Sequence, residues 1–167
     1  MPSIDVSFTR SAKPGDGLAV LLAAAGAKFG ASAEQADPAK VIDKAVKVSK
    51  FAGKPLSILD LLAPSGSAFD RIVGIGVGEP AAINAQSWLK LGGTIQSQLR
   101  KSSKVTVYLD APGFEIGGND AADVALGFML RAYRFDKYRT KKDDADNGDE
   151  PAKVKLTIVT AAATAAK

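Results

Sequence analysis

Three glycines at the end of an apolar strand are the first residues whose spacing could do chemistry. Gly74, Gly76 and Gly78 lie in the segment VGIGVGEP, directly before a stretch that is expected to begin a helix. Backbone N–H groups at such a strand-to-helix junction can hold a phosphate or another anion. The Gly-x-Gly-x-Gly spacing differs from the dinucleotide-binding fingerprint, and no lysine follows as in a phosphate-binding P-loop. We therefore favour the interpretation that these glycines relieve crowding at a strand end, and we keep an anion-binding loop as a candidate.

A basic stretch with interleaved aromatic rings is the second set of residues that could bind a ligand. It runs from residue 131 to residue 142, and its candidate nucleic-acid contacts are Arg134, Lys137, Arg139, Lys141 and Lys142. Basic residues near aromatic rings can bind nucleic acid. Cations at the end of a helix also complement its dipole, and the acidic residues 143–150 would neutralise much of their charge. We favour this structural interpretation and keep DNA binding as a hypothesis.

Hydrolytic and metal chemistry lacks its usual side chains in this sequence. The chain has no histidine and no cysteine, which removes the commonest general base, thiolate nucleophiles and histidine-bearing zinc sites. The acidic segment DDADNGDE at residues 143–150 fails the EF-hand calcium pattern, because Ala145 takes a ligand position and Val154 stands where the bidentate glutamate belongs. The acids Asp120 and Asp123 form no convincing acid/base pair. We predict no catalytic residue, no metal ligand and no cofactor in this chain.

Length and composition indicate one globular domain. The chain has 167 residues, of which 46% are hydrophobic and 24% charged, and its formal net charge is +4. This length is enough to bury one good core. The slight positive charge permits contact with nucleic acid without demanding it. The apolar segment 18–30 is too short to span a bilayer and lacks the short basic leader of a signal peptide, so we expect a cytoplasmic protein with no membrane partner.

Strand patterns alternate with helix patterns along the chain, which predicts an α/β fold with a mixed sheet. Segments 69–77 and 104–109 are apolar on both faces, as interior strands of a mostly parallel sheet are. The last predicted strand alternates apolar residues with lysine and threonine and should have one solvated face. The predicted strands lie at residues 4–8, 18–22, 56–64, 69–77, 104–109 and 154–158.

Three longer helices are predicted, and the spacing of their apolar residues predicts which face of each is buried. Trp88 at this spacing indicates core packing rather than a ligand platform. The predicted helix starts are Asp37 with Pro38, Glu79 with Pro80, and Asn119 or Asp120. The predicted core faces are Val41, Ala45, Val48 and Ala52 in the first helix, Trp88, Leu91, Ile95 and Leu99 in the second, and Leu126, Met129, Leu130 and Tyr133 in the third.

The run ALGFMLRAYRFDKYRTKK at residues 125–142 resembles a pattern in the N-terminal domain of the leucyl (cytosol) aminopeptidase family. The order of segments is also similar: a strand ending in VGIGVGE, a long helix, a VTVYLD strand, this run and a late LTIVT strand. The resemblance covers most of the chain. The matching residues of the run are Ala125, Leu126, Gly127, Leu130, Arg131, Tyr133, Phe135, Tyr138, Thr140, Lys141 and Lys142.

This resemblance implies a macro-domain-like three-layer sandwich with a central mixed sheet flanked by helices. It implies that residues 1–160 form a non-catalytic N-terminal domain, and that residues 161–167 begin a linker helix to a missing C-terminal catalytic domain. In the family that C-terminal domain binds two divalent metals (Mn or Zn) and contains an Asn-Thr-Asp-Ala-Glu-Gly-Arg motif, which does not occur here. No metal-binding or catalytic residue is therefore carried over to this chain.

The implied function is that of the accessory domain of a bacterial-type leucyl aminopeptidase, which removes N-terminal amino acids from peptides. The implied partners are the C-terminal catalytic domain and further copies in a hexamer, where the N-terminal domain helps to shape access to the active site. Some bacterial relatives also bind DNA. The alternative from another class is a free-standing macro-type module that binds a nucleotide, ADP-ribose or DNA through the three glycines or the basic stretch.

Overall fold

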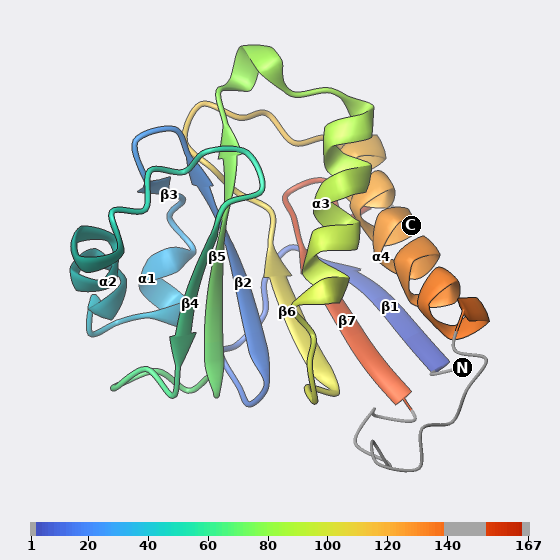
Figure 1. The fold of residues 1–167 in the computed structure, drawn as a ribbon, viewed down its shortest axis with the longest axis horizontal. Coiled ribbons are helices and arrows are strands. Elements are labelled where there is room, and N and C mark those ends of the chain that lie inside the picture. Colours follow the sequence, from blue (N-terminus) through green and yellow to red (C-terminus); the bar gives the residue numbers. More distant parts are fainter. Residues whose placement is uncertain (1–2, 139–152, 165–167) are drawn as a thin grey trace.

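The computed structural model describes residues 3–138 and 153–164, without the side chains of residues 134–138 (Figure 1). Within these residues seven strands form one sheet in the order β1-β7-β6-β2-β5-β4, with β3 paired to β2 off this path. The strands are β1 Ser3–Thr9, β2 Leu18–Ala24, β3 Lys28–Phe29, β4 Ile58–Leu62, β5 Arg71–Gly78, β6 Lys104–Tyr108 and β7 Lys153–Val159. The helices are α1 Ala33–Ala36, α2 Val41–Ser49, η1 Pro80–Ala82, α3 Ala85–Ser97 and α4 Gly118–Tyr138, where η1 is a 3-10 turn.

The sheet is mixed, as the sequence predicts. Strands β1, β7, β6, β2 and β5 run parallel to one another, whereas β4 is antiparallel to β5 and β3 is antiparallel to β2. Strands β2 and β5 are buried along their whole length, because both faces of the sheet are covered there. The interior positions predicted for segments 69–77 and 104–109 are confirmed by β5 and β6.

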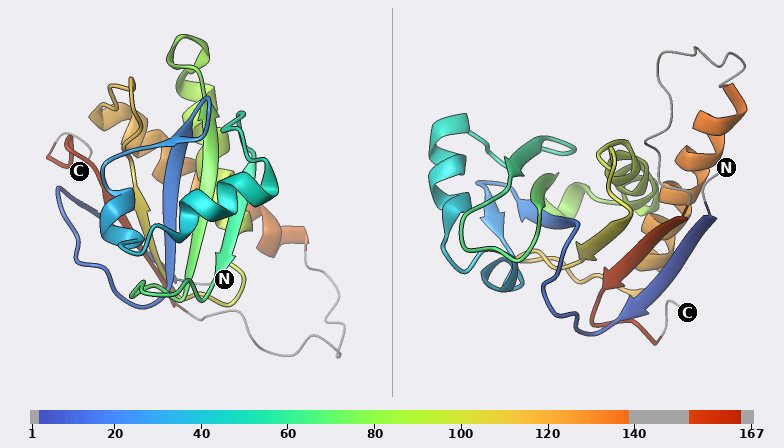
Figure 2. Two further views of the ribbon diagram at one scale, coloured as in Figure 1. Left: turned by 90° about the vertical axis from the view of Figure 1, so that its left-hand side faces the viewer. Right: turned by 90° about the horizontal axis from the view of Figure 1, so that it is seen from below.

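The domain is a three-layer α/β sandwich, which confirms the predicted fold class. Helices α3 and α4 lie on one face of the sheet, and α1 with α2 lies on the other (Figures 1 and 2). Alternate residues of β2 point into opposite cores: Leu18, Val20 and Leu22 belong to the core under α3 and α4, and Ala19 and Leu21 to the other. In β7 Lys155 is exposed while its neighbours Val154 and Leu156 are buried, so the predicted solvated face is confirmed.

Helices α3 and α4 touch through their backbones. A Cβ atom built on Gly92 of α3 would overlap the carbonyl oxygen of Val124, and one built on Gly127 of α4 would overlap the carbonyl oxygen of Leu89. Each helix therefore has its glycine where the other helix comes closest. The neighbouring Gly93 is different, because its nearest atoms lie at the ordinary contact distance of 3.8 Å.

The predicted start of α2 is wrong, and its predicted core face is correct at Ala45 but wrong at Val48 and Ala52. The helix begins at Val41 rather than Pro38, because residues 37–40 form a turn in which Lys40 has a left-handed φ of 55°. The Asp37 carboxylate still accepts a hydrogen bond, at 2.7 Å, from the N–H of Ile42 in the first turn of the helix. Val48 is 77% exposed, and Ala52 lies beyond the end of the helix. The buried residue of this helix is Ile42, with Ala45 and Val46 half-buried beside it.

The start of α3 also lies later than predicted, whereas its core face is confirmed. Pro80 opens the 3-10 turn η1, and α3 begins at Ala85 behind an Asn84 cap. The Asn84 side chain accepts a hydrogen bond from the Ser87 N–H at 3.0 Å, and the Ser87 hydroxyl accepts one from the Asn84 N–H at 3.2 Å. This reciprocal pair satisfies two N–H groups that a helix start leaves free. The predicted core residues Trp88, Leu91, Ile95 and Leu99 are all buried.

The predicted core face of α4 is wrong, and its large apolar residues face outwards. Leu126, Met129, Leu130 and Tyr133 are 42%, 39%, 46% and 53% exposed. The helix begins at Gly118, so neither Asn119 nor Asp120 is the residue before its first turn; the Asp120 carboxylate accepts the Gly117 N–H at 2.9 Å. The close approach of α3 leaves room mainly for small side chains on the inner face, whose buried residues are Ala121, Val124, Ala125, Phe128 and Ala132.

The described chain ends in a turn at residues 161–164, and residues 165–167 lie outside the described part. The linker helix expected at 161–167 therefore stays a prediction. No helix in the described part of the chain is long and apolar enough to cross a membrane.

The α3–α4 contact predicts that alanine substitutions at the adjacent residues Gly92 and Gly93 affect stability differently. Gly92→Ala should lower the free energy of unfolding by about 1–3 kcal/mol, because the added methyl group overlaps the α4 backbone. Gly93→Ala should leave it unchanged or raise it by up to about 1 kcal/mol, since alanine favours a helix and meets only open contacts there. Urea unfolding of both variants measures the difference, and equal midpoints would show that the helices are not held this closely.

Candidate functional site

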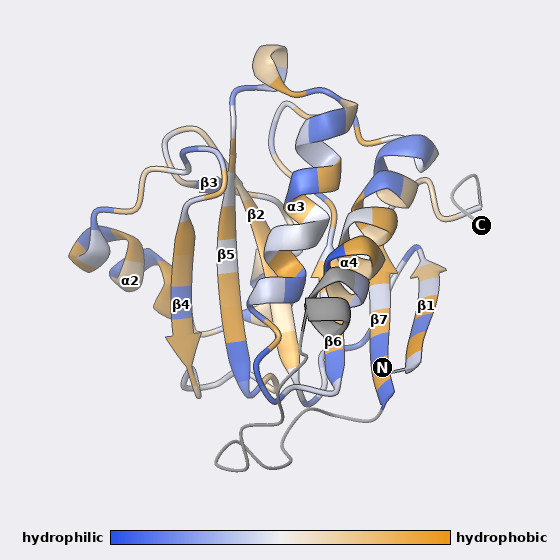
Figure 3. Cartoon of the chain, turned by 45° about the vertical axis from the view of Figure 1, so that its right-hand side comes forward, coloured by the Kyte–Doolittle hydropathy of each residue, from blue (hydrophilic) through white to orange (hydrophobic). Residues whose placement is uncertain are grey.

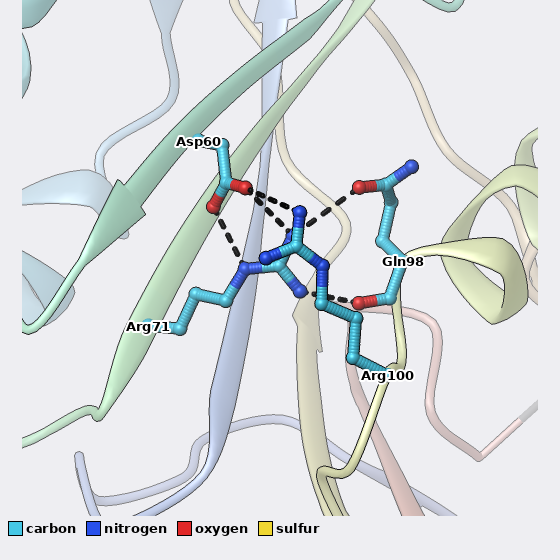
Figure 4. A network of polar contacts seen from close by, with 4 residues as sticks. All are labelled: Asp60, Arg71, Gln98 and Arg100. Atoms are coloured by element: carbon cyan, nitrogen blue, oxygen red, sulfur yellow. Dashed lines mark hydrogen bonds and ion pairs between the residues drawn. The ribbon is translucent and has the colours of Figure 1, made fainter. Parts of the chain in front are cut away.

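A buried arginine organises the most extensive polar network of the described residues (Figure 4). The Arg71 side chain is only 6% exposed. Its Nε donates to Asp60 Oδ1 at 2.7 Å and its Nη2 to Asp60 Oδ2 at 2.9 Å, which makes a two-pronged ion pair. Its Nη1 donates to the Gln98 carbonyl oxygen, and its Nη2 also donates to Gln98 Oε1 at 3.2 Å. One guanidinium therefore joins β4, β5 and the end of α3.

The local structure explains why these groups meet. Asp60 of β4 lies opposite Val73 of β5 in the antiparallel register, so it shares a sheet face with Arg71, two residues before Val73. Gln98 directly follows the last residue of α3, where helix carbonyls lack intrahelical partners. A cation at this position satisfies a carbonyl and complements the negative end of the helix dipole.

The network sets the charge state of its carboxylate. The hydrogen bonds from Arg71 hold the pKa of Asp60 below its ordinary value of 3.8, and the charges of Arg71 and Arg100 act in the same direction. Partial burial of the carboxylate opposes this shift. Arg100 contributes a longer contact of 3.3 Å from a side chain that is 58% exposed, so Arg71 is the dominant partner.

A pocket of about 440 Å³ lies beside this network, at the end of the sheet where strands β5 and β6 begin. Basic and acidic side chains both line it. Lys104 donates to the Asp16 carboxylate at 2.9 Å, and the Asp70 carboxylate accepts the Gly17 N–H at 2.8 Å. These charged side chains therefore already have partners within the domain. Among the described residues no group of three or more histidine, cysteine, aspartate or glutamate side chains could hold a metal ion.

A second polar cluster lies at the other end of the sheet, just after the last residue of strand β6. The Asp110 carboxylate accepts hydrogen bonds from the Ser32 hydroxyl and, at 3.0 Å, from the Ser32 N–H, which ties the loop before α1 to the end of β6. The nearby Tyr108 hydroxyl is buried and has no hydrogen-bond partner in the described part of the chain. Burial, and secondarily the charge of Asp110, raise the pKa of Tyr108 above 10.0.

The three glycines of the candidate anion-binding loop all belong to β5. Gly76 and Gly78 lie against segment 53–57, whereas Gly74 lies against the Phe29 ring. The N–H groups of Gly76 and Gly78 donate to the carbonyl oxygens of Ser57 at 2.9 Å and Gly53 at 3.0 Å. A Cβ on Gly76 would overlap the Lys54 carbonyl oxygen, and one on Gly78 would approach Pro55 to 2.8 Å. These contacts match the crowding that we favour as the reason for the glycines. An anion could use the two N–H groups only by displacing segment 53–57, and anion binding stays an untested candidate.

The structure does not describe the side chains of the candidate nucleic-acid contacts, so it does not show whether they lie together. Arg134 and Lys137 belong to α4, but their side chains are outside the described part. Arg139, Lys141 and Lys142, like the acidic segment 143–150, lie outside it entirely. DNA binding through these residues therefore stays a hypothesis that the described residues do not test. Trp88 does pack in the core as predicted, 3% exposed and edge-on to Phe114 at a ring distance of 6.4 Å.

Sequence reasoning missed the Arg71 network, although the sequence carries a signal for it. Arg71 opens the apolar run RIVGIGV, and Asp60 stands inside the apolar run ILDLL. A charge within an apolar strand must find a partner, because an unpaired buried charge is strongly unfavourable. Two opposite charges in neighbouring predicted strands therefore indicated an ion pair.

Removal of the Asp60 charge should destabilise the fold in a pH-dependent way. Asp60→Asn leaves Arg71 buried without its counter-ion, so the free energy of unfolding at neutral pH should fall by about 1–3 kcal/mol. A lowered pKa means that the ion pair contributes above the ordinary value of 3.8 and is lost as the pH falls through the lowered value. The difference between parent and variant should therefore hold from neutral pH down to about 4 and shrink below it.

Asp16→Asn is the matched control for this measurement, because the Asp16–Lys104 pair has 68% and 55% exposed side chains. At each pH between 7 and 3, the urea midpoint of this variant should differ little from that of the parent protein. Equal losses in the two variants would show that Arg71 does not depend on Asp60.

Comparisons with known proteins agree with this architecture. The family model described as "Cytosol aminopeptidase family, N-terminal domain" matches residues 20–142. A probable cytosol aminopeptidase of Sinorhizobium medicae (strain WSM419) is 51% identical over all of this chain and 34% of its own length. The probable cytosol aminopeptidase of Rhizobium etli (strain CIAT 652) is 49% identical over 98% of this chain and 33% of its own length.

Solved structures show the same fold at low sequence identity. A tomato leucine aminopeptidase mutant superposes with a TM-score of 0.70 and 20% identity over 94% of this chain and 32% of that chain. A bottromycin maturation enzyme, BotP, superposes with a TM-score of 0.60 and 16% identity, over 91% of this chain and 29% of that chain. The chain thus spans about a third of the length of the curated relatives that it matches. It belongs to the cytosol aminopeptidase family, and it corresponds to the N-terminal domain of that family.

Proposed function

We propose that this chain is the accessory N-terminal domain of a metal-dependent aminopeptidase, whose full-length form removes N-terminal amino acids from peptides. The observation that carries the proposal is the match to relatives named probable cytosol aminopeptidases, which are about half identical to this chain and about three times as long. The match of residues 20–142 to the N-terminal domain of the cytosol aminopeptidase family supports it as well.

In this proposal the chemistry belongs to a C-terminal catalytic domain that carries two divalent metals, manganese or zinc. Residues 1–160 are the accessory domain, and residues 161–167 begin the linker to the catalytic domain. The accessory domain contributes to the packing of a hexamer and to access to the active site, in the cytoplasm. A rigid sandwich with two cores and a sheet covered on both faces over β2 and β5 is suited to such a positioning role.

The proposal predicts that activity is present in the full-length protein and absent from the 167-residue chain. The full-length protein should hydrolyse leucyl-p-nitroanilide, lose this activity on treatment with a chelator and regain it with Mn²⁺ or Zn²⁺. The 167-residue chain, which has no histidine or cysteine, should give no turnover above buffer under the same conditions. Turnover that survives repurification and follows the 167-residue chain would overturn the proposal, as would an inactive, correctly folded full-length protein supplied with metal.

A free-standing binding module remains the alternative, because of the Gly74–Gly78 segment and the basic residues 131–142. Calorimetry with ADP-ribose tests the first feature, and DNA binding across a salt series tests the second. We expect neither ligand to bind well. ADP-ribose would have to compete for the N–H groups of Gly76 and Gly78, which already donate to carbonyl oxygens of the protein. Tight, saturable ADP-ribose binding would favour the module. DNA affinity that is independent of sequence and collapses with salt would indicate only a basic surface.

A further inference from the structure

The pocket beside the Arg71 network lies where three loops of the chain meet. Leu62, the last residue of β4, lies opposite Arg71, the first residue of β5, and Leu18 at the start of β2 lies on the other side of Arg71. The loop before β2, the loop from β4 to β5 and the loop from α3 to β6 therefore gather at this end of the sheet (Figure 1). Figure 3 shows hydrophilic residues at this end of β5 and β6, whereas the middle of β5 is hydrophobic. The pocket volume of about 440 Å³ lies within the range of small-molecule sites, about 300–1,000 Å³.

Two exposed carboxylates line this pocket, and the backbone fixes their positions. Gly17 has a φ of 96°, and a Cβ atom built on it would overlap the carbonyl oxygen of Lys104. The loop before β2 therefore comes directly against the start of β6, which brings Asp16 beside Lys104. The Gly17 N–H donates to the Asp70 carboxylate at 2.8 Å, and the Gly17 carbonyl oxygen accepts the Asp70 N–H at 3.0 Å. This reciprocal pair fixes the second carboxylate next to the residue that follows Asp16.

Positive charges line the same pocket and outnumber the carboxylates: Arg71, Arg100, Lys101 and Lys104. Arg71 is held by the network described above, so it forms part of the wall. The Arg100 side chain is 58% exposed and makes one long contact of 3.3 Å with Asp60. Lys104 is paired only with Asp16 among the printed contacts of its side chain, and both side chains are more than half exposed. Groups of both signs therefore face the same open space.

The spacing of these charges indicates which class of ligand fits. An exposed ion pair is worth little in water, so a ligand that supplies both charges can replace it. The Lys104 Nζ atom lies 2.9 Å from both oxygens of the Asp16 carboxylate, so the two charges of such a ligand must also lie close together. A free α-amino acid meets this requirement, because its ammonium and carboxylate groups are attached to one carbon atom. In a peptide the two termini are farther apart, and a simple anion gives Asp16 and Asp70 no cationic partner.

We propose that this pocket binds a free α-amino acid with an apolar side chain. Its ammonium group donates to Asp16 and Asp70, and its carboxylate accepts hydrogen bonds from Lys104 and Arg100. Its side chain lies against Leu62, which lines the pocket and is 69% exposed, so that apolar surface of both leaves water. The bound amino acid replaces the partners that Lys104 and Asp16 have in each other, and no charge is left unpaired.

An NMR titration of the isotope-labelled 167-residue chain with L-leucine tests this assignment, because amide signals report where a ligand binds. The signals of Gly17, Ser103 and Lys104 should shift in a saturable way, and those of α2 on the opposite face should not. N-acetylleucine lacks the ammonium charge, leucinamide lacks the carboxylate, and leucyl-leucine has its charged termini farther apart. Each of these three should bind at least about tenfold more weakly than leucine.

Substitutions separate the contributions of the pocket residues. Asp16→Asn and Lys104→Gln should each weaken leucine binding at least about tenfold, while the exposure of this pair should keep the fold intact. Leu62→Ser should weaken leucine binding at least about threefold and leave the binding of glycine, which has no side chain, unchanged. Lys47→Gln removes the same charge as Lys104→Gln from α2, and this control should bind leucine as the parent protein does.

Three outcomes would overturn the inference. The first is the absence of saturable shifts with leucine at millimolar concentrations. The second is binding of N-acetylleucine or of inorganic phosphate at the same amides as strongly as leucine, because the pocket would then recognise anions alone. The third is an unchanged leucine affinity in both Asp16→Asn and Lys104→Gln, because the ligand would then use neither charge.

The inference goes beyond the proposed function, since it rests on the side chains of the pocket alone. A free amino acid is also what the proposed peptidase releases, but binding to the 167-residue chain requires no catalytic domain. Leucine binding together with an inactive, folded full-length protein would refute the proposed function alone. Metal-dependent activity of the full-length protein without leucine binding to the 167-residue chain would refute the amino-acid pocket alone. Activity together with leucine binding is the result that we expect.

Discussion

The backbone contact between α3 and α4 is the constraint on which much of this domain depends. Gly92 and Gly127 remove side chains at the closest approach, so the two helices can share one face of the sheet. Because Gly127 must face α3, the rotation of α4 about its own axis is fixed. Small residues such as Ala121 and Ala125 then face the core beside Phe128. Leu126 and Leu130 are turned outwards by the same rotation, which makes a packing requirement the origin of an exposed surface.

A second constraint acts at the edge where β5 begins. Arg71 is almost fully buried, and a buried ion pair contributes little net stability unless its hydrogen bonds are complete. Here the guanidinium makes two bonds to Asp60 and two to Gln98, so the desolvation of its charge is offset by well-placed partners. The Lys104 Nζ–Asp16 Oδ2 distance is similar, at 2.9 Å, but both side chains are exposed to water. Such an exposed pair contributes little to the free energy of unfolding. The two pairs therefore have different roles despite similar geometry.

The sequence was sufficient to predict the class of fold and every strand of the described residues except the short β3, Lys28–Phe29. Strands β5 and β6 have near-continuous apolar character because both of their faces are covered, and this property is local to each segment. Helix starts were harder to predict, because a turn before α2 and a 3-10 turn before α3 delay each helix by several residues. These delays depend on hydrogen bonds such as that from Ile42 to Asp37, which composition alone does not specify.

The inner face of α4 could not be read from apolar spacing, because this helix has two apolar faces. The spacing of Leu126, Met129, Leu130 and Tyr133 predicts that the face with the larger side chains is buried. The face with the smaller side chains is the one that meets α3 and the sheet, because Gly127 admits the backbone of α3 and no larger residue could. The larger side chains of Leu126, Met129, Leu130 and Tyr133 consequently lie on the outer, partly exposed face of the same helix.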